Sequence, residues 1–291
     1  MTPTMPTTFL ITGATGTVGT PLVEMLAARG ARVRAMMRHP ERTRLPASVE
    51  RVAGDLSDED SVALALAGVD RVFHLSAGPD GPIHDDIMAK AAHAAGVQHV
   101  VKLSVLGVEE GADDLITQWH RSGERSFLDA GLNTTFVRPN GFMSNSLHWA
   151  PSIAAAGTVY APIGDLPVAW VDPLDVSAVA FDALVRPGPP GTGYAVTGPD
   201  AVSPREQVAI LTEVLRRPIT FTEITPDQAR DQLVHYGMPD LLAEAVVGTM
   251  TSPQRGHGMT PTTTVETVTG LAPRPYRDWA FAHRGAFLHE R

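Results

Sequence analysis

The chain has 291 residues, enough to bury the core of one large domain or of a domain with an appended lobe. Its formal net charge is −9 and no Lys/Arg-rich block occurs, so a general nucleic-acid binder or a membrane-surface protein is not expected. The absence of cysteine excludes disulfides, thiolate catalysis and cysteine-ligated metals. Residues 1–8 lack the features of a signal peptide and no apolar run reaches membrane-spanning length, so we expect a cytoplasmic protein.

A strand, a glycine turn and a helix are predicted at the start of the chain. The apolar residues 9–11 enter a turn with glycines at positions 13, 16 and 19, after which apolar residues recur at helical spacing. Glycine lets the backbone approach a pyrophosphate closely, and the unpaired amides of a helix start favour an anion. A glycine triplet alone also occurs in unrelated turns, but in this context it predicts a dinucleotide site. The predicted cofactor contacts are Gly13, Thr15, Gly16, Thr17, Val18 and Gly19.

Strands and helices then alternate up to residue 138. Because strands that alternate with helices at this spacing pair in parallel through right-handed crossovers, the predicted fold class is α/β, a Rossmann-type doubly wound parallel sheet. Strands are predicted over 31–37, 52–56, 70–75, 99–104 and 134–138, and helices over 57–68, 83–95 and 119–130.

The composition changes after residue 138. Residues 140–166 hold many Gly, Pro, Ser and Ala residues, which predicts a substrate-facing segment with little regular structure. Later elements are a returning helix and strand (171–186, 194–197), five helices (203–216, 227–236, 239–250, 264–270, 276–287) and a flexible loop at 251–259. We therefore expect a Rossmann domain formed by 1–138 and 171–197. A smaller, mostly helical substrate lobe is formed by 139–170 and 198–291.

These residues carry a family resemblance. The turn at 12–19 resembles the glycine motif of extended and atypical short-chain dehydrogenases/reductases. More narrowly, the chain resembles the NmrA-like group, which includes NAD(P)H-dependent quinone oxidoreductases and triphenylmethane reductase. Further stretches that match that group are 33–38, 54–56, 119–132, 137–142 and 265–287, so the resemblance covers nearly the whole chain. It is specific for the fold and the cofactor, and much less so for the reaction.

The second strand indicates which cofactor is preferred. A fold that prefers NAD carries an acidic residue after this strand, but no acid stands between Arg29 and Glu41. The strand ends instead at Arg38, whose forked, permanently charged side chain suits a 2′-phosphate. A solvated basic loop is the alternative; we favour NADP(H) over NAD(H). The resemblance places Asp55 and Leu56 at the adenine, and Ser76 and Ala77 beside the pyrophosphate and ribose.

The usual catalytic pattern of this family is incomplete here. Short-chain reductases use a Ser and a Tyr-x-x-x-Lys motif, but all four tyrosines of this chain lie at position 160 or later. The matching helix position holds His120, with Glu124 one turn further on, and Ser104 matches the family serine. His120 could protonate a substrate or bind the ribose, since its pKa lies near neutrality, or it could form an ordinary helix-face pair with Glu124. Ser104 and His120 are the candidate catalytic residues and also cofactor contacts.

The residues after the sixth strand are expected to face the nicotinamide and the substrate. Pro139 and Asn140 are predicted to pass the nicotinamide, although Pro-Asn-Gly is also a common turn sequence. Nearby apolar residues either line an apolar substrate pocket or cover the sheet edge. The candidate substrate residues are Phe142, Met143, Trp149 and Tyr160. The acidic pairs 85–86, 109–110 and 113–114 are interpreted as solvated, and the scattered histidines predict no metal site.

The sequence favours an NADP(H)-dependent oxidoreductase that transfers a hydride to a small apolar or aromatic quinone, enone or ketone. A non-catalytic NAD(P) sensor that binds a protein partner is the alternative, because the Tyr-x-x-x-Lys motif is missing. A nucleotide-sugar epimerase or dehydratase is a third hypothesis, disfavoured because those enzymes generally keep the tyrosine and lysine. We expect a monomer or homodimer acting on a small molecule, with no nucleic-acid or membrane partner.

Overall fold

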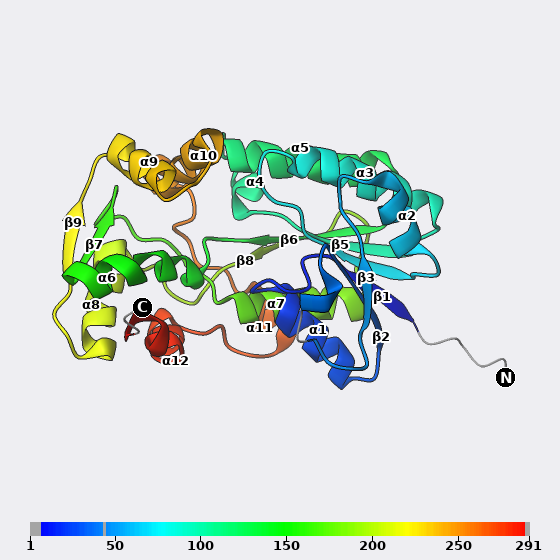
Figure 1. The fold of residues 1–291 in the computed structure, drawn as a ribbon, viewed down its shortest axis with the longest axis horizontal. Coiled ribbons are helices and arrows are strands. Elements are labelled where there is room, and N and C mark those ends of the chain that lie inside the picture. Colours follow the sequence, from blue (N-terminus) through cyan, green and yellow to red (C-terminus); the bar gives the residue numbers. More distant parts are fainter. Residues whose placement is uncertain (1–6, 43–44, 289–291) are drawn as a thin grey trace. The chain divides into compact units, whose positions relative to one another are not determined.

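The computed structural model describes residues 7–42 and 45–288 (Figure 1). The chain forms two compact units. The first comprises the described parts of Met1–Val105, Gln118–Arg138 and Val176–Tyr194, and the second comprises those of Leu106–Thr117, Pro139–Asp175 and Ala195–Arg291. Each unit is therefore assembled from segments that lie far apart in the sequence.

A seven-stranded sheet has the strand order β3-β2-β1-β4-β5-β6-β8, and β1 pairs in parallel with both β2 and β4. The pairs β2–β3, β4–β5 and β5–β6 are also parallel. This arrangement confirms the predicted Rossmann-type doubly wound fold. The strands are β1 (Thr8–Ile11), β2 (Arg32–Met37), β3 (Glu50–Ala53), β4 (Arg71–His74), β5 (His99–Leu103), β6 (Thr134–Pro139) and β8 (Gly193–Val196).

Helices cover both faces of this sheet. In Figure 1, α2, α3 and α5 lie on one face, while α1 and α7 lie on the other. The α7 helix follows residues 139–172 of the second unit in the chain, but from Val176 on it belongs to the first unit. Ser177 Oγ donates to Val18 O, and Arg71 donates to the last carbonyls of the helix, at Leu184 and Val185. Their bounds are α1 (Gly19–Ala28), α2 (Glu59–Leu66), α3 (Gly81–Ala94), α5 (Leu115–Asp129) and α7 (Pro173–Val185), with a 3-10 turn η1 (Pro40–Arg42).

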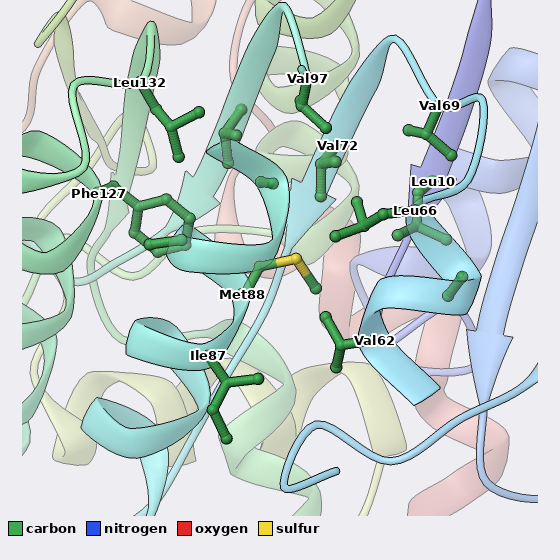
Figure 2. Packing of buried hydrophobic residues seen from close by; sticks show 14 of the residues in the cluster. Leu10, Val62, Leu66, Val69, Val72, Ile87, Met88, Val97, Phe127 and Leu132 are labelled. Atoms are coloured by element: carbon green, nitrogen blue, oxygen red, sulfur yellow. The ribbon is translucent and has the colours of Figure 1, made fainter. Parts of the chain in front are cut away.

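The α2, α3 and α5 layer packs on the sheet through one apolar cluster, shown in Figure 2. Leu10, Val72 and Val100 enter it from three neighbouring strands, and Met88 and Phe127 enter it from α3 and α5. All five side chains are fully buried. Because side chains alternate along a strand, Lys102, two positions on from Val100 in β5, points to this same face.

The second unit contains most of the remaining elements. A two-stranded parallel sheet pairs β7 (Thr158–Ala161) with β9 (Thr220–Glu223). The helices and 3-10 turns are α4 (Leu106–Glu110), η2 (Met143–Trp149), α6 (Ala150–Ala156), α8 (Pro204–Leu215), α9 (Pro226–His235), α10 (Asp240–Met250), η3 (Ser252–Arg255), α11 (Thr264–Thr269) and α12 (Tyr276–Leu288). The predicted cap of α8 is present, because Ser203 and Glu206 form a reciprocal capping box.

Two predictions for the second unit were wrong. Residues 140–166 are not largely irregular, because they form η2, α6 and β7. The partner of β7 is a strand about 60 residues away, so its pairing leaves no trace in local composition. The 251–259 segment is not a free loop: it contains η3, and Gly258 N donates to both carboxylate oxygens of Glu110, at 2.8 and 3.1 Å. Gly258 O accepts from Asn140 Nδ2 at 2.8 Å and from Ala169 N at 2.9 Å.

One backbone position in the second unit is strained. Arg216 ends α8 with φ +53°, the single positive φ of a non-glycine residue among the described residues. Its side chain is exposed, and its amide still donates to Glu213 O. A left-handed residue costs about 1 kcal/mol when it carries a Cβ, and glycine is the usual residue at this position.

We expect Arg216→Gly to raise the free energy of unfolding by about 0.5–1 kcal/mol, because glycine relieves the left-handed strain. Urea denaturation measures the change. The matched control is Arg216→Ala, which removes the same side chain but keeps a Cβ in the left-handed conformation. An equal gain in both variants would assign the effect to the arginine side chain and contradict the backbone explanation.

Candidate functional site

The predicted cofactor residues of the first unit lie along one edge of the sheet. Since the strands pair in parallel, their carboxyl ends meet at the same edge. The strand order reverses where β1 and β4 lie side by side, and such a switch point is where a doubly wound sheet binds its ligand. The glycine turn follows β1, Arg38 follows β2, Ser76 follows β4 and Ser104 follows β5.

The glycine turn is tightly closed at this edge. Gly13 has φ +62°, and its carbonyl accepts a hydrogen bond from Gly16 N at 3.0 Å. A Cβ on Gly19 would overlap Gly13 O and lie 2.7 Å from its carbonyl carbon, so only glycine lets α1 begin here. Residues 15–17 are exposed, and α1 starts at Val18 without a side-chain cap. The helix start therefore offers an uncapped, positively polarised end to an anion.

Thr12 fixes the end of β1 to the end of β4. Its amide donates to Phe73 O at 3.0 Å, and its hydroxyl accepts from Leu75 N at 2.8 Å and donates to Leu75 O at 3.3 Å. A Cβ on Gly13 would already touch the Leu75 side chain at 3.4 Å. The turn and the segment that carries Ser76 and Ala77 are thus held at one place on the edge.

The charged side chains after β2 and β3 differ in the number of hydrogen bonds and ion pairs that they form. Arg38 is exposed, and within 7–42 and 45–288 its guanidinium has no ion pair or hydrogen bond. The Asp55 carboxylate accepts from Ser57 N at 3.0 Å and Ser57 Oγ at 2.6 Å, and these bonds, with a smaller contribution from the Arg38 charge, lower the Asp55 pKa. Leu56 packs against the apolar cluster of Figure 2. Among the described residues, Arg38 is therefore a cation without a protein partner beside this part of the edge.

A buried polar network lies behind the edge, and the sequence did not predict it. Asp85, which we expected to be solvated, is 1% exposed. Its Oδ1 accepts from His74 Nε2 at 2.9 Å, from Ser76 Oγ at 2.7 Å and from Lys102 Nζ at 2.9 Å. Lys102 and His74 are 0% exposed, so all three bonds are shielded from water. The one signal in the sequence was a lysine inside the buried strand at 99–104.

The electrostatics of this network are set by burial and by the ion pair. Burial opposes ionisation of Asp85, but the hydrogen bond from His74 and the charge of Lys102 outweigh it and hold the pKa of Asp85 well below its usual range. Burial lowers the pKa of His74 despite its bond to Asp85. His74 is therefore neutral, and we assign the proton to Nε2 from its partners. The network contains one anion, one cation and no net charge.

Ser104 and His120 carry polar atoms that have no partner within the described chain. Ser104 is 2% exposed and its Oγ is buried without a hydrogen bond, as is Nδ1 of His120. Native proteins rarely leave buried polar atoms unpaired unless a ligand or water satisfies them. Burial, followed by the positive charge of Lys102, lowers the pKa of His120 to about 3, so its imidazole is neutral at physiological pH.

The helix-face pair that we considered for His120 is not formed. Both carboxylate oxygens of Glu124 are engaged by Arg138: Nε donates to Oε1 at 2.9 Å and Nη2 donates to Oε2 at 2.6 Å. This bidentate pair is largely buried and ties α5 to the end of β6. His120 is thus left without the carboxylate that would have raised its pKa.

The candidate residues after β6 lie in the second unit. The Asn140 side chain is saturated by the backbone: Nδ2 donates to Ala169 O at 3.1 Å and to Gly258 O, and Oδ1 accepts from Gly141 N at 2.9 Å. This is the turn-forming role that Pro139-Asn140-Gly141 also allowed. Its amide therefore has no free N–H to offer a ligand.

The four substrate candidates divide between core and surface. Met143 is 1% exposed and belongs to the apolar core of the second unit, against which Trp149 packs. Phe142 is partly buried and forms an isolated bridge with Val171. Tyr160 is exposed on β7. The structure brings Met143 and Trp149 together as packing residues, and it leaves Tyr160 on the surface.

The described residues contain neither a metal cluster nor a membrane-spanning helix. Among residues 7–42 and 45–288, no three His, Asp or Glu side chains gather as a metal site requires. No helix in the described part of the chain is both long and apolar enough to cross a membrane.

Comparison with known proteins adds to this geometry. A protein-family profile described as NAD(P)H-binding matches residues 13–159. The (4-alkanoyl-5-oxo-2,5-dihydrofuran-3-yl)methyl phosphate reductase of Streptomyces griseus subsp. griseus is 46% identical over 283 residues, covering 97% of this chain and 99% of that protein. The chain belongs to this NAD(P)H-binding family. Another relative, the NAD(P)H azoreductase of Xenophilus azovorans, is 35% identical over 283 residues, covering 96% and 98%.

Solved structures share the fold. The NADPH complex of a quinone oxidoreductase from Escherichia coli has a TM-score of 0.83 at 22% identity, covering 95% of this chain and 99% of that one. Triphenylmethane reductase of Citrobacter sp. has a TM-score of 0.82 at 20% identity, covering 94% and 99%. NmrA, a negative transcriptional regulator, has a TM-score of 0.76 at 18% identity, covering 95% of both. The fold that the resemblance to the NmrA-like group implied is thereby confirmed. With relatives named as reductases at 46% and 35% identity, the chain is an NAD(P)H-dependent oxidoreductase of small molecules.

We expect Gly19→Ala to weaken NADPH binding at least about tenfold, or about 1.4 kcal/mol, because the added methyl overlaps Gly13 O and opens the turn. Quenching or enhancement of NADPH fluorescence measures the Kd. The control is Gly248→Ala in α10, where the nearest atom to a new Cβ is 3.7 Å away. If the two variants bind NADPH equally well while both remain folded, the turn is not the phosphate site.

Proposed function

We propose that the chain is an NADP(H)-dependent reductase that delivers a hydride to an electron-poor C=C bond or quinone. The observation that carries the proposal is the edge of the sheet: an uncapped helix start for the pyrophosphate, and two buried, unpaired polar atoms on Ser104 and His120. In this proposal 1–138 and 171–197 hold the cofactor, while 139–170 and 198–291 bind the substrate. Phe142, Trp149 and Tyr160 are its candidate substrate contacts, since they are not fully buried, whereas Met143 is.

The preference for the phosphorylated cofactor rests on Arg38. Its free, exposed guanidinium follows β2, where NAD-preferring folds carry an acid. Of the two nearby acids, Asp55 is engaged by Ser57 and Glu41 lies 3.7 Å from His39. A guanidinium fork can bind two oxygens of a phosphate at once, which supports NADP(H).

We expect Arg38→Glu to raise the Kd for NADPH at least about tenfold more than the Kd for NADH, because only NADPH carries the 2′-phosphate. Isothermal titration calorimetry with each cofactor measures the ratio. The control is Arg32→Glu, an exposed charge reversal at the other end of β2. An equal loss for both cofactors in the Arg38 variant would contradict the assignment.

Named relatives narrow the proposed substrate. The Streptomyces griseus protein is named as the reductase of an acyl-substituted 5-oxo-2,5-dihydrofuran, which is an unsaturated lactone, and the Xenophilus azovorans protein as an azoreductase. An Escherichia coli relative, 26% identical over 253 residues, is named quinone oxidoreductase 2. Conjugated lactones, quinones and azo groups share a π bond whose empty π* orbital is low in energy and accepts a hydride. We favour the conjugated lactone or enone, because the 46% identical relative carries that name.

The protein's part in the reaction is to bind the cofactor and the substrate, to orient them, and to polarise the substrate. Bound NADPH supplies the hydride, and the substrate takes it at the electron-poor carbon. The oxygen that becomes negative then needs hydrogen-bond donors, a role that the Ser104 hydroxyl and a neutral His120 N–H can fill. Because His120 carries no extra proton near pH 7, it acts in this proposal as a hydrogen-bond donor and not as an imidazolium acid.

We expect His120→Ala to lower kcat about tenfold without abolishing NADPH binding, because one hydrogen bond to the reacting oxygen is lost. In the wild-type protein, kcat should show no ionisation of this imidazole between pH 5 and 8, since the pKa of about 3 keeps it neutral throughout. The control is His93→Ala, an exposed histidine on α3. Unchanged turnover in the His120 variant would reduce His120 to a packing residue.

A substrate panel tests the function itself. The assay follows loss of NADPH absorbance with unsaturated lactones, enones, quinones, azo dyes and ketones, and includes one lactone with and without a phosphate group. We expect the conjugated lactones and enones to have the highest kcat/KM. Tight NADPH binding with no turnover on any member would favour the non-catalytic sensor.

A further inference from the structure

A buried ion pair lies directly beneath the proposed reaction site. Lys102 is 0% exposed on β5, and its Nζ donates to Asp85 Oδ1 at 2.9 Å, with longer contacts of 3.4 Å to Ser76 Oγ and Leu103 O. Ser104 comes directly after β5, and its amide still donates to Val137 O of β6 at 2.7 Å, so the alternation of side chains along the strand extends to it and places it on the same side as Lys102. The Lys102 side chain is therefore the neighbour of Ser104, whose hydroxyl has no partner among the described residues, on this side of the sheet.

Such a pair is not an efficient way to stabilise a core. Removing two charges from water costs several kcal/mol per ion, and apolar side chains of similar volume often stabilise a protein equally well. Beyond these polar partners and His74, Lys102 borders the apolar cluster, because the ring centroid of Phe127 lies 5.9 Å from its Nζ. Two uncharged side chains of similar volume could therefore take the place of the pair without loss of stability.

Helix α5 rests on this pair at a glycine. A Cβ added to Gly123 would overlap the Asp85 carboxylate, lying 2.6 Å from its Cγ, and would lie 3.0 Å from Lys102 Cε. The α5 backbone therefore contacts both charged side chains directly. His120 lies three residues before Gly123, so it belongs to the adjacent turn on the same side of α5. Glu124, the residue after Gly123, forms an ion pair with Arg138 and so holds α5 to the end of β6.

We propose that Lys102 and Asp85 are positioning residues for the reduction, because the pair seats α5 at Gly123 and so sets where His120 and Ser104 stand at the reaction site. This inference rests on the proposed function of those two residues. The pair acts through geometry, since neither charged group is itself exposed at the edge. It also acts through charge, because Lys102 from β5 and Asp85 from α3 are the ionisable groups that influence His120.

The decisive variant removes both charges together. Lys102→Met with Asp85→Asn leaves no uncompensated ion, and the Asn Oδ1 can still accept from His74 and Ser76, so the fold can be retained. The control is Lys90→Met with Asp86→Asn, which removes an exposed ion pair from the same helix α3, one residue along from Asp85. Three quantities are compared with the wild-type protein: the midpoint of thermal unfolding, kcat and KM for the preferred acceptor, and the ring resonances of His120 in the cofactor-free protein.

We expect the Lys102/Asp85 variant to melt within about 5 °C of the wild-type protein yet to lose at least about tenfold in kcat, since a displacement of about 1 Å can cost a hundredfold in rate. Its His120 ring resonances should move in the cofactor-free protein. The control variant should change neither kcat nor these resonances. A folded Lys102/Asp85 variant with wild-type kcat and unmoved His120 resonances would overturn the proposal, because a purely structural pair leaves both unchanged.

A second variant approaches the same contact from the helix. Gly123→Ala keeps both charges but places a methyl against the Asp85 carboxylate, so α5 or the pair must move. We expect the same loss of kcat and the same shift of the His120 resonances, and a folded Gly123→Ala protein with wild-type values would also overturn the proposal. If the wild-type protein reduces no acceptor, the proposed function fails; the cofactor-free His120 resonances then still decide whether the pair positions this residue.

Discussion

Oδ1 of Asp85 accepts hydrogen bonds from His74, Ser76 and Lys102, which belong to β4, to the segment after it and to β5. The ends of two neighbouring strands and helix α3 therefore meet at one carboxylate oxygen. In a medium of low polarity each of these bonds is strong, and each would be costly to leave unmade. The positions of these strand ends thus depend on the charged groups of this network as well as on the apolar cluster.

What could be predicted from the sequence was local in nature. Gly13, Gly16 and Gly19 reveal the turn because their spacing reflects backbone constraints within one strand–turn–helix unit. The alternation of elements up to residue 138 predicted the sheet because parallel pairing follows from connection length. Arg38, Ser104 and His120 were singled out by their position after a strand or on a helix, and in the structure Arg38 follows β2, Ser104 follows β5 and His120 lies on α5. Their roles at a cofactor stay predictions.

What could not be predicted depends on contacts between distant parts of the chain. Asp85 stands next to Asp86 in the sequence, and nothing local separates the buried acid, 1% exposed, from its neighbour, which pairs with Lys90 on the surface. The side chain of Asn140 is engaged by Gly258, 118 residues later. A polar residue reveals its partner only after the topology is known, so composition assigned the acids to solvent and the amide to a ligand.

The attachment of α7 has a consequence for how this protein can be divided. Ser177 and the last carbonyls of α7 bind Val18 and Arg71, so a helix from the later sequence closes one face of the sheet that begins the chain. A fragment ending at residue 138 would expose that face and leave β6 without β8 as a neighbour. Recombination or truncation at the obvious compositional boundary would therefore break the cofactor unit. The segment between β6 and α7 can be exchanged only for insertions that preserve both ends.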